Sequence, residues 1–368
     1  MNKSLIALAV AGAFVAPVAM ADTTIYGTAH VSFNVVNSGS GGATANQVAS
    51  NASAIGFKGS EDLGGGTSAI WQIESNVNLD NSGSNAAGGV ALGGNDSFAG
   101  LSGKDWGTLI LGQHDTPYKI ASRGLDLFAD TVADNRNLLG PLDMTNRTHV
   151  GDVVAYISPA MSGVTVAAAY VAGAEIPVSG GTKGSAYSLA ALYGAGPINA
   201  ALAYQTLTLG SAGTGTLGTS TPNDKISAWT LGGGYTMDAF TVNAQYEGVT
   251  YDPSGYGCGS QNQSNWYLAG KYNIGNDAVK LAYANAGKSA VAKAMCADDS
   301  NTDASQISVG YDHSLSKTTT VYALYTQVSN KDRANYTMGG YDGITANVAP
   351  AKAGSDPSVW SVGMKHSF

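Results

Sequence analysis

The chain has 368 residues and a net charge of −8, and 12% of its residues are charged. The acidic balance argues against a nucleic-acid partner, because binding to phosphates needs a basic surface. So few charges, together with 49 glycines, also argue against an ordinary soluble surface, on which about 25–35% of residues are charged.

The first 21 residues have the pattern of a secretory signal peptide. Lys3 stands near the start, a mostly apolar run follows, and a small-residue Ala-Met-Ala site ends at residue 21. The run is short for a membrane anchor and contains Pro17, and a buried N-terminal helix is the other alternative. We expect cleavage before Asp22, which leaves residues 22–368 with 17 basic and 26 acidic residues.

Alternation of apolar and polar residues begins directly after this segment. In TTIYGTAHVSFNVV (23–36), one parity carries isoleucine, valine and phenylalanine, and the other carries threonine, histidine and asparagine. The same period recurs around 228–235, in FTVNAQYEG (240–248), at 266–274 and in the terminal VWSVGMKHSF (359–368). A period of two is typical of strands with two different faces. No later stretch is long and apolar enough to cross a bilayer as a helix.

The connections between these strands are of two kinds that alternate along the chain. Seven are short and rich in turn residues, and eight are long. The short ones lie at 60–66, 104–107, 158–163, 194–197, 236–239, 275–277 and 314–318, and the long ones at about 37–52, 80–95, 114–148, 173–185, 209–224, 252–264, 287–303 and 330–356. Together they join sixteen strands and leave both chain ends on the side of the short turns.

This arrangement predicts an all-β fold, a 16-stranded antiparallel transmembrane β-barrel of the outer-membrane type. Within a bilayer every backbone group must be paired inside the protein, so the sheet has to close and the last strand has to pair with the first. That requirement explains why the alternation continues to Phe368. At about sixteen strands the lumen holds water. The alternatives, a soluble propeller or an exported sandwich, are less favoured because no Gly-His or Trp-Asp blade signature is present.

Several segments resemble the general porins of Gram-negative outer membranes, above all the neisserial and beta-proteobacterial type. They are IYGTAHVSF, IGFKGSEDLGGG, FAGLSGKDWGTLILGQ, YISPAMSG and the terminal VGMKHSF, and the similarity covers essentially the whole mature chain. The resemblance implies a homotrimer in the cell outer membrane, in contact with lipid and lipopolysaccharide, with both termini periplasmic. It also implies that the third long loop folds inward and narrows a water-filled channel for ions and small hydrophilic solutes.

Charged residues concentrate in this third long connection, 114–148. We expect the pore constriction to be formed by Lys119, Arg123, Asp126, Asp130, Asp134, Arg136, Asp143 and Arg147. Opposed acidic and basic groups across a narrow aqueous gap would create a transverse field that sorts solutes by charge. The alternative is a solvated surface loop with ordinary salt bridges, each contributing about 0–1 kcal/mol.

Residues on the polar parity of the strands are expected to line the pore wall. The candidates are Tyr26, Thr28, His30, Lys58, Glu74 and Gln113, and further charges on this parity are Glu247, Lys271, Lys280 and Lys365. Basic or polar wall positions of the family are occupied here by Ala54, Asn95, Gln113 and Ala155. Because this basic ladder is largely missing, we expect weak ion selectivity and assign it no direction.

The opposite parity of the first strand contains Gly27 and Ala29. Two such small residues permit close backbone approach, so we interpret them as part of the contact between subunits. The alternative is that the glycine eases a strongly twisted strand.

Cys258 and Cys296 are the only cysteines of the chain. They lie in the sixth and seventh long connections, which should be neighbours on the outer side, and an exported chain meets an oxidising compartment. We predict a disulfide between them. Two free thiols, or bonds to another chain, are the alternatives.

Motifs for other chemistry lack the context that they need. GTGTLG (213–218) has no helix after it, AYANAGKS (282–289) departs from a phosphate-binding loop at its first residue, and DDSNTD (298–303) lacks the glycine and distal glutamate of a calcium loop. The five histidines form no metal motif or close pair. We therefore expect no cofactor, no metal and no enzyme activity. A solute-specific porin and an outer-membrane barrel enzyme are the alternative functions.

Overall fold

The computed structural model describes residues 22–80, 92–140, 149–172, 184–209, 223–255 and 257–368. The predicted signal peptide at 1–21 lies outside the described residues, as do Asp143 and Arg147. Within the described ranges, no helix is both long enough and apolar enough to cross a membrane.

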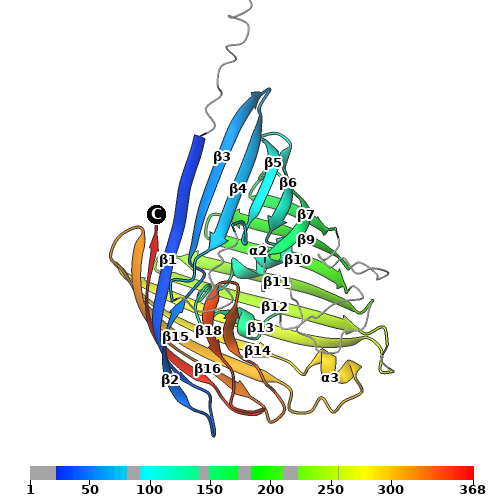
Figure 1. The fold of residues 1–368 in the computed structure, drawn as a ribbon, viewed down its shortest axis with the longest axis vertical. Helices are drawn as coiled ribbons and strands as arrows, with labels where there is room; N and C mark the ends of the chain where they lie inside the picture. Colours follow the sequence, from blue (N-terminus) through cyan, green and yellow to red (C-terminus); the bar gives the residue numbers. More distant parts are fainter. Residues whose placement is uncertain (1–21, 81–91, 141–148, 173–183, 210–222, 256) are drawn as a thin grey trace, which may run out of the picture.

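The described chain is dominated by antiparallel strands that pair in chain order (Figure 1). The first half of the wall is built from β1 (Asp22–Asn37), β2 (Thr44–Ser50), β3 (Ala54–Gly64), β4 (Thr67–Asn76), β5 (Ser97–Gly103), β6 (Gly107–His114), β7 (Val150–Ile157) and β8 (Val164–Val171). The second half is built from β9 (Ser185–Ala195), β10 (Ile198–Thr208), β11 (Lys225–Met237), β12 (Phe240–Asp252), β13 (Gln261–Ile274), β14 (Asp277–Ala286), β15 (Ala304–Ser314), β16 (Thr319–Asn330) and β19 (Ser358–Ser367).

The sheet closes on itself, which confirms the predicted 16-stranded barrel. β19 pairs with β16 on one side and with β1 on the other. β2 pairs with the later half of β1 and β3 with its earlier half, so these two segments together occupy one of the sixteen strand positions. The last residue belongs to the sheet, because Phe368 and Gly27 exchange two backbone hydrogen bonds of 3.0 Å.

The alternation predicted from the sequence corresponds to the two faces of the wall. On β19, Trp360 and Val362 are 65% and 62% exposed on the outer face, whereas Val359 and Ser361 are buried on the inner face. Aromatic and aliphatic side chains on the outside suit hydrocarbon, and buried polar side chains on the inside suit an occupied, partly aqueous lumen.

The first long connection is shorter than predicted. The sequence predicts a loop over about 37–52, but residues 44–50 form β2 and pair with β1 from Val31 to Asn37. The segment reads TANQVAS, with valine as its one large apolar residue, so it carries almost no alternation. Its strand conformation is supported by backbone pairing to β1, which a pattern of side chains does not reveal.

Several long connections have secondary structure of their own. The third contains helix α2 (Pro117–Arg123) and the 3₁₀ turn η2 (Asn135–Asn137), and the seventh contains α3 (Ala290–Ala294). The last contains a hairpin of β17 (Met338–Tyr341) and β18 (Ile344–Val348). A disulfide joins Cys258 to Cys296 and so links the sixth and seventh connections.

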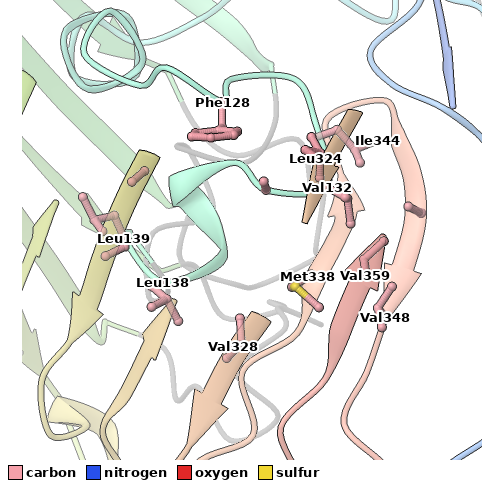
Figure 2. Close-up of a cluster of buried hydrophobic side chains, with 14 of the residues drawn as sticks. Phe128, Val132, Leu138, Leu139, Leu324, Val328, Met338, Ile344, Val348 and Val359 are labelled. Carbon is pink, nitrogen blue, oxygen red and sulfur yellow. The ribbon is translucent and has the colours of Figure 1, made fainter. Parts of the chain in front are cut away.

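The third connection and the β17–β18 hairpin fill part of the barrel and pack on each other (Figures 1 and 2). The predicted inward-folded third loop is therefore confirmed. The side chains of this interior core that are labelled in Figure 2 come from the third connection, from the hairpin and from β16 and β19, and they are Phe128, Val132, Leu138, Leu139, Leu324, Val328, Met338, Ile344, Val348 and Val359. Other wall strands also contribute to this interior core, for example β13 with Tyr267. Burial of this apolar surface holds both segments inside the lumen.

Candidate functional site

Helix α2 begins the inward course of the third connection. Thr116 precedes it as N-cap, and its Oγ1 accepts a hydrogen bond of 3.2 Å from the backbone N–H of Lys119. Pro117 stands at the first helical position, where no N–H is needed. The sequence Thr-Pro therefore fixes where this short helix starts, directly after β6.

Polar side chains of the inner wall hold α2 in place. The backbone N–H of Tyr118 donates to Oγ of Ser188 on β9 at 2.9 Å. The phenol of Tyr118 donates to Oε1 of Glu247 on β12 at 2.6 Å, and Thr116 Oγ1 donates to Gln205 on β10 at 3.2 Å. Because β9, β10 and β12 all contribute, the helix lies against the second half of the wall.

The chain then follows the inner wall toward β15. Asn243 Nδ2 on β12 donates to the carbonyl of Leu125 at 2.8 Å, and the phenol of Tyr267 on β13 donates to Asp126 Oδ1 at 2.8 Å. Gln306 Nε2 on β15 donates to the carbonyl of Ala133 at 2.9 Å. Successive strands thus bind successive residues, which fixes the path of the third connection.

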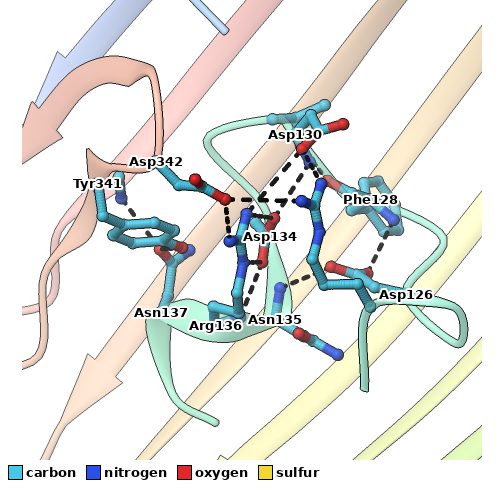
Figure 3. Close-up of polar contacts among 12 residues, drawn as sticks. Asp126, Phe128, Asp130, Asp134, Asn135, Arg136, Asn137, Tyr341 and Asp342 are labelled. Atoms are coloured by element: carbon cyan, nitrogen blue, oxygen red, sulfur yellow. Dashed lines mark hydrogen bonds and ion pairs between the residues drawn. The ribbon is translucent and has the colours of Figure 1, made fainter. Parts of the chain in front are cut away.

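The charged residues of this connection meet the tip of the β17–β18 hairpin. Asp342 lies within ion-pair distance of four basic side chains, and two of these contacts are drawn in Figure 3. The distances from its carboxylate are 2.6 Å to Arg136 Nη1, 3.0 Å to Lys119 Nζ, 3.2 Å to His149 Nε2 and 3.5 Å to Arg123 Nη1. We call these four residues the basic cluster.

Other carboxylates complete the network around the basic cluster. Arg136 also pairs with Asp134 at 2.7 Å, Lys119 with Asp115 at 2.6 Å, and Arg123 with Asp130. On the wall side, Lys365 Nζ of β19 lies 3.8 Å from Asp130. The network therefore joins the two inward-folded segments to each other and reaches the wall at one edge.

Burial and pairing act against each other on the acid–base behaviour of this network. Burial alone would lower the pKa of His149, but hydrogen bonds to Asp115, Asp342 and Asp96 outweigh it and raise the pKa to about 11. Burial would raise the pKa of Asp115, yet His149 and Lys119 lower it to about 2. Burial would also raise the pKa of Asp342, but His149, Lys119 and Arg136 hold this pKa well below its usual range. His149, Asp115 and Asp342 are thus ionised at neutral pH.

Asp96, Asp115 and His149 offer ligand atoms within 4.8 Å of one another, the spacing of a possible metal site. His149 Nδ1 lies 2.8 Å from Asp96 and 3.0 Å from Asp115. The ammonium of Lys119 already stands against Asp115. A second cation would meet this positive charge at close range, so the three residues fit an ion-pair network better than a metal centre.

The sequence profile of Gram-negative porins matches residues 7–333. The chain belongs to this family. The major outer membrane protein P.IB of Neisseria lactamica is 30% identical over 328 residues, which cover 87% of this chain and 91% of that protein. The resemblance inferred from the sequence is therefore confirmed.

Solved structures agree with this assignment at the level of the fold. An anion-selective porin from Comamonas acidovorans has a TM-score of 0.78 and 23% identity, covering 95% of this chain and 100% of that chain. The trimer form of OmpT from Vibrio cholerae has a TM-score of 0.68 and 15% identity, covering 95% and 99%. Family and fold make this porin an outer-membrane channel for passive diffusion and not an enzyme.

The predicted constriction residues take two different positions in this porin. Lys119, Asp134 and Arg136 are at most 1% exposed, and Asp126 accepts hydrogen bonds from two backbone N–H groups and the Tyr267 phenol. Arg123 and Asp130 keep 23% and 21% of their side chains exposed. Among the described residues, the expected opposition across an aqueous gap is thus replaced by direct ion pairs, and Lys365 joins them 3.8 Å from Asp130.

The predicted wall residues of β1, β3 and β4 form contacts of their own. Tyr26 donates to Glu74 at 2.8 Å, and Lys58 Nζ lies 4.9 Å from the centre of the Tyr26 ring. Thr28 contacts Ser367 at 3.3 Å, whereas His30 is buried against the phenol of Tyr322 at 2.9 Å. Gln113 lies at a register shift of β6 and donates to the carbonyl of Gly94.

Sequence reasoning missed Asp342, His149 and Asp96. A local signal for the first was present, because Asp342-Gly343 between two short β-prone runs is typical of a two-residue hairpin turn. Both residues have positive φ, 50° and 76°, as such a turn requires. Sequence reasoning also found no close histidine pair, yet His114 and His149 both lie near Asp96, at 3.7 Å and 2.8 Å. Nothing local in the sequence indicates this convergence.

Proposed function

We propose that this porin forms a weakly selective, water-filled channel for ions and small hydrophilic solutes, narrowed by the third connection together with the β17–β18 hairpin. One observation carries the proposal: the third connection is bound along the inner wall from β9 to β15 while Arg123 and Asp130 keep water access. Lys365, on the inner face of β19, is 43% exposed beside them. Charged side chains with water access inside a closed barrel define a path for ions.

Weak selectivity follows from the pairing of the charges. Each of the three basic residues that the structure describes in the third connection has a carboxylate partner: Asp115 for Lys119, Asp130 for Arg123, and Asp134 for Arg136. Paired charges of opposite sign largely cancel at the distance of a passing ion. The wall positions 54, 95 and 155 carry no charge and so do not add a strong field of either sign.

We further propose a homotrimer in the outer membrane, in contact with lipid and lipopolysaccharide, formed after removal of residues 1–21. The apolar outer face and the similarity to the trimer form of OmpT support this assembly. Asp22 pairs with Ser60, close to the short turn between β3 and β4, and Phe368 ends beside Gly27. Both ends of the mature barrel therefore lie on the short-turn side, which we assign to the periplasm.

Single-channel recording in a planar bilayer under a KCl gradient tests this proposal. We expect conductance steps in groups of three and a reversal potential close to zero. Saturable block of the current by one solute class would indicate a solute-specific porin instead. Folded protein without any conductance would contradict the proposed open channel.

A further inference from the structure

We propose that Asp342, at the tip of the β17–β18 hairpin, determines the ion selectivity of this porin by occupying the basic cluster as an internal counter-anion. The inference rests on the proposed channel and deepens it, because it names the residue that keeps the channel from favouring anions. It concerns the last long connection, which lies about 200 residues beyond the third one in the chain, at a separation of 206 for Arg136 and Asp342.

The geometry makes Asp342 the shared partner of the cluster. Its Oδ2 lies 2.6 Å from Arg136, 3.0 Å from Lys119 and 3.5 Å from Arg123, and its Oδ1 lies 3.2 Å from His149. The side chain itself is only 3% exposed. A carboxylate surrounded by four cations occupies the position that a small anion would take in a bound state.

Water access places the cluster beside the ion path. Arg123 and His149 keep 23% and 13% of their side chains exposed, whereas Lys119 and Arg136 are buried behind them. A change of charge at Asp342 therefore alters the electrostatic potential at Arg123 and His149, the two residues through which the cluster contacts the aqueous lumen. Screening by salt is weak at these partly buried positions.

The hairpin does not depend on Asp342 alone for its position. The backbone N–H of Gly339 donates to Asn137 Oδ1 at 3.0 Å, and the N–H of Ala52 donates to the carbonyl of Gly343 at 2.8 Å. Met338 and Ile344 are buried in the interior core. Removing the charge of Asp342 while keeping its shape should therefore leave the hairpin in place and change the electrostatics.

The decisive comparison is between Asp342→Asn and Asp332→Asn in the same planar-bilayer assay. Asp332 lies in the same connection and is exposed, so its substitution removes the same formal charge without touching the cluster. We expect the Cl⁻/K⁺ permeability ratio of Asp342→Asn to rise about threefold, with a conductance near that of wild type, and Asp332→Asn to leave the ratio unchanged.

A second variant tests the same inference by removing a positive charge of the cluster instead of the negative charge of Asp342. Arg123→Gln removes the most exposed cation of the cluster, so it should lower the Cl⁻/K⁺ ratio and cancel most of the rise when combined with Asp342→Asn.

An unchanged ratio in Asp342→Asn, or equal shifts in Asp342→Asn and Asp332→Asn, overturns the inference while the channel proposal stands. If Asp342→Asn does not fold, a ratio unchanged in Arg123→Gln overturns it. A wild-type protein without conductance would instead contradict the channel proposal itself.

Discussion

The outer face of the barrel and the contents of its lumen are stabilised in different ways. On the outside, apolar side chains such as Trp360 and Val362 on β19 are exposed and contact only near neighbours of the same face, as Trp360 does with the ring of Tyr325 at 4.7 Å. Inside, Arg136 depends on Asp134, two residues away, and on Asp342, 206 residues away. A single substitution outside therefore removes few contacts, whereas a single substitution inside leaves several buried charges with fewer partners.

The first strand shows one place where the outer face also depends on a close fit. A Cβ built on Gly27 would lie 2.6 Å from the carbonyl oxygen of Ala54 and 2.6 Å from the ring of Phe368. Gly27 is thus required within the subunit, where it lies under the terminal aromatic ring. This packing is one reason for a glycine at position 27, and its predicted part in the contact between subunits stays a prediction.

The largest effect is predicted for Arg136→Ala. The change leaves the buried carboxylates of Asp134 and Asp342 without their shortest ion pairs, which should destabilise the folded protein by about 3–5 kcal/mol. The temperature at which the folded band converts to the unfolded band on gels measures this loss. Arg333→Ala is the matched control, because Arg333 pairs with Asp298 on the surface, where both side chains are 53% exposed. Equal melting temperatures for the two variants would contradict the distinction between outside and inside.

A smaller loss is predicted for Gly27→Ala. Since the added methyl group meets a backbone oxygen that cannot move aside cheaply, the expected destabilisation is about 1–3 kcal/mol. Gly270→Ala is the control, because the nearest atom to its Cβ would be 3.9 Å away. The same gel assay compares the two variants. A melting temperature of Gly27→Ala no lower than that of Gly270→Ala would show that Phe368 does not need the glycine beneath it.

The sequence predicts the wall of this barrel far better than its interior. Alternation is local, so strand 359–368 and the closure at Phe368 can be derived from neighbouring residues. The inward position of the third connection comes from the family resemblance. The partners of its charges come from elsewhere in the chain, and no periodicity links Arg136 to Asp342. Segment 44–50 was missed for a related reason, because backbone pairing rather than side-chain pattern makes it a strand.

The smallest effect is predicted for pH, and it distinguishes Asp126, in the third connection, from His149, directly after it. Asp126 is partly buried near the charge of Asp134, and burial and this charge raise its pKa to about 7, although hydrogen bonds from Asn135, Phe128 and Tyr267 oppose the shift. His149 is partly buried among opposite charges, and its pKa of about 11 keeps it protonated. Between pH 5 and 9, we therefore expect Asp126 to titrate and His149 to remain charged.

The sign of the effect follows from the proton that Asp126 releases. As pH rises through about 7, the interior gains one negative charge, so the reversal potential should move slightly toward cation preference. Because the folded pKa lies above the ordinary value, the folded state keeps a proton that the unfolded chain loses, and stability should fall from about pH 4 to about pH 7. Reversal potentials recorded from pH 5 to 9 should titrate in wild type and in His149→Gln, and should be flat in Asp126→Asn. A titration of the reversal potential with a midpoint near pH 6.5 that disappears in His149→Gln would contradict this assignment. It would mean that the carboxylates around His149 do not keep it protonated, so that ion pairing inside the lumen is weaker than the distances indicate.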